Sequence, residues 1–142
     1  MKMPIIVLSY GMFSGDNKRL FSYNNSNQSH IMPIFTDPVI AAVFASSMMA
    51  ATEIKERLVP QVCANHKDAA DMFTTISLLA PDLRTIVIDP TPITEDGRQK
   101  LTQIGVFAQD RDIDIGALIE DLQNTEVSDE EIIRANTEND TQ

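Results

Sequence analysis

The residues of this chain that could carry chemistry are a cysteine–histidine pair and a group of aspartates. Cys63 and His66 stand three positions apart, with Asp68 and Asp71 nearby, as in a thiolate–imidazole pair with an orienting carboxylate. Such a pair needs its side chains in contact. We expect Cys63 in a strand and His66 in the first turn of a helix, with a bend between them. A lone cysteine more often acts as a small buried apolar residue, so we predict no catalytic residue.

Asp110, Asp112 and Asp114 resemble the opening of a calcium-binding loop. An EF-hand loop requires glycine at its sixth position and a bidentate glutamate at its twelfth. In this chain those positions hold Ile115 and Asp121. An acidic loop that caps a helix explains the three aspartates better. We therefore predict no metal site and no cofactor.

The net charge of −10 is concentrated in the last third of the chain. Residues 1–93 carry 7 Lys/Arg against 8 Asp/Glu, whereas residues 94–142 carry 4 against 13. An acidic surface repels nucleic-acid phosphates and anionic lipids, so we predict no direct binding to nucleic acid or membrane. Acidity of this kind also serves solubility alone.

These charges favour a non-enzymatic protein-binding or regulatory module whose acidic region engages a basic partner protein. The predicted protein-binding residues are Asp110, Asp112, Asp114, Glu120 and Asp121. One alternative is a nucleic-acid mimic that inhibits a DNA-binding protein. The other alternative, ranked last, is a small-molecule enzyme or sensor that uses Cys63 and His66.

Length and composition predict one globular domain. With 142 residues, 43% hydrophobic and 23% charged, the chain can bury a core without disulfides or metals. The single cysteine excludes an intramolecular disulfide framework. The apolar run of residues 5–8 is too short for a signal peptide or a membrane span, so a cytoplasmic location is expected. The oligomeric state stays open.

The first third of the chain predicts three strands. Residues 5–8 form a continuous β-branched run, which is typical of a strand buried on both faces. Residues 18–23 and 30–35 flank a polar loop and predict a β-hairpin. Pro33 cannot donate to a ladder, so its strand should lie at a sheet edge or carry Pro33 on its free side.

The middle of the chain predicts two helices and two strands. Asp37 followed by Pro38 is a clear helix start, and the apolar stripe that follows predicts a helix ending between residues 50 and 57. Residues 58–64 suit a short edge strand. Asn65 predicts the N-cap of a second helix, which Pro81 ends, and residues 85–89 form a β-branched strand.

The C-terminal part predicts helices. Thr94 can open a helix within residues 93–107, and Asp112 or Asp114 can cap a helix that runs through Leu122. A capping box at residues 128–131 predicts a last short helix around residues 129–135. We therefore predict an α+β fold with a small mixed or antiparallel sheet of about four to five strands, packed by two to four helices. The expected single domain spans residues 1–135, with an acidic helical part at 94–135 and a disordered tail at 136–142.

Short motifs in the middle of the chain resemble the N-terminal domain of the enhanced-serine-sensitivity (SseB) protein family. They are residues 32–37 (MPIFTD), 41–44, 62–73 and 86–90 (IVIDP), within a stretch of roughly residues 20–92. Asp89 stands where the family usually has asparagine, and the acidic C-terminal part has no counterpart. The resemblance implies a small mixed α/β domain without a known catalytic residue. It also implies that Phe35, Thr36 and Pro90 mark packed strand ends.

Overall fold

The computed structural model describes residues 2–10, 20–24, 30–52 and 57–125. Within these ranges the chain forms one five-stranded sheet of order β3-β1-β2-β4-β5 and four helices. The predicted α+β fold class is confirmed. The elements are β1 (Ile5–Tyr10), β2 (Ile31–Phe35), α1 (Pro38–Ala51), β3 (Leu58–Cys63), α2 (His66–Leu79), β4 (Thr85–Ile88), α3 (Glu95–Ile104), β5 (Arg111–Asp114) and a fourth helix over residues 115–125.

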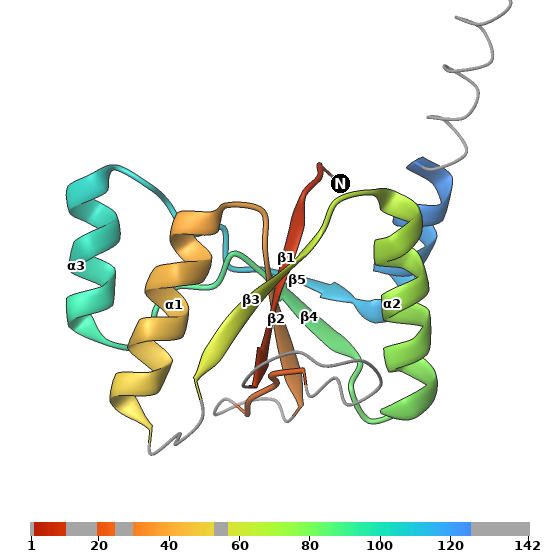
Figure 1. Ribbon diagram of the computed structural model, residues 1–142, viewed down its shortest axis with the longest axis horizontal. Helices are drawn as coiled ribbons and strands as arrows, with labels where there is room; N and C mark the ends of the chain where they lie inside the picture. The colour runs from red at the N-terminus through yellow and green to blue at the C-terminus, as the bar shows by residue number, and fades with distance from the viewer. Residues whose placement is uncertain (1, 11–19, 25–29, 53–56, 126–142) are drawn as a thin grey trace, which may run out of the picture.

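The sheet is mixed and lies between two helical layers. β2 and β4 are parallel neighbours at its centre, whereas the β1–β2, β1–β3 and β4–β5 pairs are antiparallel. Helices α1 and α3 lie on one side of the sheet, and α2 and the fourth helix, drawn in blue, lie on the other (Figure 1). Each side has its own core. Phe35 and Phe44 belong to the α1 side, and Phe73 and Leu118 belong to the α2 side.

Three helices begin at side-chain caps that the sequence predicted. Asp37 accepts from the Val39 amide at 2.8 Å, Asn65 accepts from the Asp68 amide at 2.8 Å, and Thr94 caps α3. Each cap satisfies an amide at the helix start that has no intrahelical acceptor. These boundaries are set locally, which is why the sequence predicted them.

The predicted hairpin of residues 18–23 and 30–35 is wrong in the described region. Tyr23 and Ile31 form one isolated bridge, and β2 instead pairs with β1 and β4. β2 is also not an edge strand. Pro33 is tolerated because the β1–β2 ladder ends at Ile34, and the Leu8 carbonyl accepts from the Phe21 amide at 2.8 Å. A neighbouring segment thus supplies the amide that Pro33 lacks.

Strand β5 was not predicted. Its residues Arg111–Asp114 have low β propensity, and they join the sheet because β4 offers a long-range partner. Asp114, not Asp112, caps the fourth helix, and accepts from the Gly116 amide at 2.9 Å. Residues 18–19 of the expected hairpin, the helix expected at 129–135 and the tail expected at 136–142 lie outside the described residues.

Replacing Leu118 with alanine tests whether the fourth helix belongs to the core. Leu118 is fully buried, so Leu118→Ala should lower the free energy of unfolding by about 2–5 kcal/mol. Leu78→Ala is the matched control, because Leu78 lies on α2 with 78% of its surface exposed and should change stability by about 0.5 kcal/mol or less. Urea unfolding measures both. Equal effects of the two substitutions would contradict the packing.

Candidate functional site

The five predicted protein-binding residues lie on or beside β5 and on the fourth helix, but two of them have structural partners. Both carboxylate oxygens of Asp110 accept from Thr91, one from its amide at 2.6 Å and one from its hydroxyl. Asp114 caps the fourth helix. These two side chains add negative charge to the surface, but their carboxylates already accept hydrogen bonds from within the chain.

The other three predicted residues differ in their surroundings. Asp112 is exposed on β5, and Glu120 is exposed on the fourth helix. Neither side chain makes a hydrogen bond or ion pair with a described residue. Asp121 is engaged in an interaction of its own and lines a hollow described below. The structure therefore places the acidic residues on the edge strand β5 and on the adjacent fourth helix, but does not gather them around a single point.

Tyr23 reports the negative potential near β5. Burial of its phenol, together with the nearby carboxylates of Asp110 and Asp112, raises the pKa of Tyr23 to about 12. Both effects disfavour the phenolate, because burial removes water from a charge and carboxylates repel it. Asp110 and Asp112 therefore act on the same neighbour, Tyr23.

The carboxyl ends of β2 and β4 are joined by Asp89, which the sequence did not indicate as important. Asp89 follows β4 directly and is 1% exposed. Its Oδ1 accepts from the Thr36 amide at 2.8 Å, and its Oδ2 accepts from the Thr36 hydroxyl at 2.6 Å and from Gln109 Nε2 at 2.8 Å. The Asp89 amide in turn donates to the Ile34 carbonyl at 2.9 Å. One residue thus holds three chain segments together.

Asp89 and Asp110 both adopt left-handed backbone conformations, each with φ of 48°. Aspartate and asparagine enter this region more readily than other side chains that carry a Cβ. The Asp110 amide donates to the Asp89 carbonyl at 3.1 Å, so the two bends face each other. The signal that could have found Asp89 is an aspartate placed between a buried β-branched strand and a proline.

A hollow of about 490 Å³ opens beside the carboxyl ends of β2 and β4, and we call it the carboxyl-edge hollow. Thr36 and Gln109, the two partners of Asp89, lie in its wall together with Lys2 and Arg111. Neither Lys2 nor Arg111 makes an ion pair with a described residue. The hollow therefore combines two cations, neither ion-paired to a described residue, with two polar groups that Asp89 holds through hydrogen bonds.

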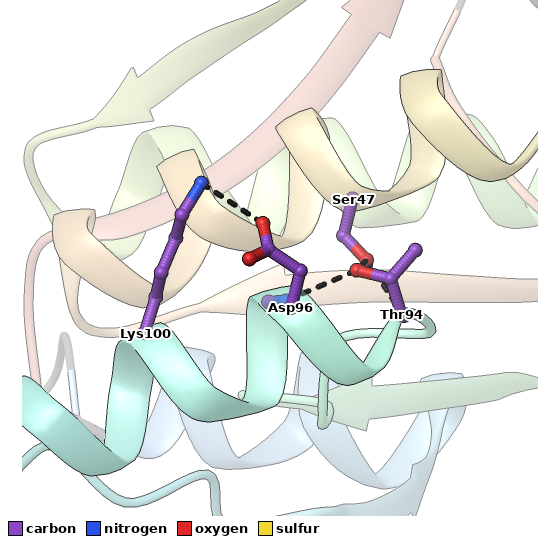
Figure 2. Close-up of polar contacts among 5 residues, drawn as sticks. Ser47, Thr94, Asp96 and Lys100 are labelled. Atoms are coloured by element: carbon purple, nitrogen blue, oxygen red, sulfur yellow. Dashed lines mark hydrogen bonds and ion pairs between the residues drawn. The ribbon is translucent and has the colours of Figure 1, made fainter.

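A second polar cluster attaches α3 to α1. Ser47 Oγ accepts from the Thr94 amide at 2.8 Å and lies 2.8 Å from Thr94 Oγ1, which itself accepts from the Gly97 amide at 3.1 Å (Figure 2). A Cβ on Gly97 would lie 2.8 Å from Pro92 Cβ, so only glycine fits this contact. An ion pair of 3.2 Å between Lys100 and Asp96 lies on the exposed side of α3. We assign this cluster to helix packing.

Cys63 and His66 lie where the sequence placed them. Cys63 ends β3 with a buried free thiol, whose sulfur is 3.7 Å from Met72 Sδ, and His66 begins α2. Within the described ranges, no group of three or more His, Cys, Asp or Glu side chains could hold a metal ion. The prediction that Cys63 and His66 do not act together in catalysis stays untested.

No protein-family model matches this chain, and no curated protein shows significant similarity to it. The resemblance to the SseB family therefore stays a prediction. No helix in the described part of the chain is long and apolar enough to cross a membrane.

Replacing Asp89 tests its role in joining the strand ends. Asp89→Ala removes the acceptor of two Thr36 donors and of Gln109, and should lower the free energy of unfolding by about 2–3 kcal/mol. Asp89→Asn should cost less, because it keeps one oxygen for the Thr36 amide and tolerates the left-handed backbone. Chemical denaturation measures both variants. A stable Asp89→Ala protein would show that the strand ends need no such link.

Titration of Tyr23 tests the electrostatic assignment. Its pKa in the folded state lies above the ordinary tyrosine value of about 10, so folding favours the neutral phenol. The stabilisation is complete below about pH 10 and is lost as the pH rises towards 12. Near-ultraviolet absorbance follows the phenolate, and Tyr23→Phe identifies its signal against the chain's other tyrosine, Tyr10. Asp112→Asn should lower the pKa of Tyr23, and an unchanged value would contradict the assignment.

Proposed function

We propose that this chain is a non-enzymatic protein-binding module, and that a basic extended segment of a partner adds to the open edge of β5. The observation that carries the proposal is the position of β5. It is the last strand of the sheet on its side, and no described strand lies beyond it. An exposed sheet edge offers unpaired backbone groups to another strand, and this is how many peptide-binding domains recruit their ligands.

The backbone of Asp112 faces outward from this edge. Asp89, directly after β4, donates its amide to Ile34 of β2. Because backbone direction alternates along a strand, Ile88 directs its own N–H and C=O towards β5, where it pairs with Arg111. The next residue, Asp112, therefore directs its N–H and C=O away from the sheet. No described strand pairs with these groups, so they can pair with an added strand.

The charge of the same region supports a basic partner. Residues 94–125 carry seven Asp/Glu against three Lys/Arg. On β5 itself, Asp112 and Asp114 alternate with Arg111 and Ile113, so an added strand with alternating lysines would meet carboxylates on one face. Charges on an edge strand also discourage the strand from pairing with another copy of itself.

A cytoplasmic location accords with the one cysteine, Cys63, being a free thiol.

The test uses two synthetic peptides, one of alternating lysine and valine and one of alternating glutamate and valine. The intact protein should bind the lysine peptide more tightly, and Asp112→Lys should weaken that binding about tenfold. Asp71→Lys is the matched control. Asp71 is exposed on α2, so this substitution makes the same charge change away from β5. Fluorescence anisotropy measures the affinities. Equal binding of the two peptides, or an unaffected Asp112→Lys variant, would refute the proposal.

A further inference from the structure

The carboxyl-edge hollow stands out because of where its positive charges lie. The chain carries a net charge of −10, yet Lys2 and Arg111 both line this one opening. The two cations of α3, by contrast, have partners: Arg98 donates to the carbonyls of Pro92 and Ile93, and Lys100 pairs with Asp96. Two cations that make no ion pair within the described part of the chain share one hollow of an acidic protein, which indicates a place for an anion.

The rest of the lining limits what that anion can be. Met3, Ile88 and Ile113 give the hollow an apolar side, and its volume of about 490 Å³ lies within the range of small-molecule sites. Ile88 and Ile113 belong to neighbouring strands of the sheet, so this side is rigid. A ligand that fills the hollow should therefore combine a charged head with a short apolar body.

A buried carboxylate behind the polar wall limits the charge of the ligand. Asp89 accepts hydrogen bonds from Thr36 and Gln109, and its carboxylate opposes the approach of further negative charge. A phosphate dianion would meet this repulsion twice over and has no apolar part to place. A carboxylate carries one negative charge and matches the two parallel donors of an arginine side chain.

We propose that the carboxyl-edge hollow binds a small monocarboxylate. Its carboxylate group lies between Lys2 and Arg111, and its apolar body rests on Met3, Ile88 and Ile113. Thr36 and Gln109 form the adjoining polar wall, and Asp89 keeps both in place through the hydrogen bonds described above. The site is distinct from the outer edge of β5, because side chains of both β4 and β5 line it, whereas the outer edge offers the backbone groups of Asp112.

The experiment titrates the intact protein with butyrate and follows backbone amide shifts by NMR. Butyrate should shift the amides of Thr36, Gln109 and Ile113 with a millimolar dissociation constant. Butyramide has the same shape without the charge and should bind at least tenfold more weakly, as should inorganic phosphate. Absence of these shifts up to about 100 mM butyrate would overturn the proposal, because a site weaker than this has no meaningful affinity.

Matched variants separate the two cations from general charge effects. Arg111→Gln and Lys2→Gln should each weaken butyrate binding about tenfold. Arg84→Gln and Lys100→Gln make the same charge changes outside the hollow and should leave binding unchanged. Equal losses in all four variants would show a nonspecific charge effect and refute the site. Binding of phosphate as tight as that of butyrate would refute the monocarboxylate assignment.

Discussion

The hydrogen bonds of the Asp89 carboxyl group are the constraint on which both proposed binding surfaces depend. β2 and β4 are parallel neighbours, and the chain between them runs through α1, β3 and α2 before it returns. Their ladder alone does not determine how the two strands end. Asp89 determines it, because it binds Thr36 at the end of β2 and Gln109 ahead of β5. The start of α1 and the approach to β5 are therefore set by one buried side chain.

The position of β5 follows from this link. The Asp110 amide binds the Asp89 carbonyl, and β5 begins at the next residue. Alternation along the strand then places Arg111 and Ile113 on one face and Asp112 on the other. The same four-residue strand thus contributes a cation to the carboxyl-edge hollow and a carboxylate to the surface near Tyr23. This explains how a strongly acidic segment can border a recess that two cations line.

What the sequence could predict is what local chemistry determines. Asp37, Asn65 and Thr94 cap helices through amides two or three residues away, and all three were predicted. Features that depend on distant partners were missed or wrong. β5 forms because it pairs with β4. The strand containing Pro33 lies inside the sheet because the Phe21 amide donates to the Leu8 carbonyl in place of the N–H that Pro33 lacks. The site residues were missed for the same reason, since Lys2, Thr36 and Arg111 meet only in the fold.

The two proposed binding surfaces remain compatible because charges in salt solution act over short distances. At physiological ionic strength the screening length is about 8 Å, so exposed carboxylates further away contribute little to the potential inside the hollow. A ligand there responds mainly to the nearest charges, which are Lys2, Arg111 and the Asp89 carboxylate behind Thr36 and Gln109. A partner strand on the outer edge of β5 is long and follows the surface, so it responds to Asp112 and its acidic neighbours together. The net charge therefore determines which molecules the protein repels at a distance, whereas the positions of the charged side chains around β5 determine which ligands it binds.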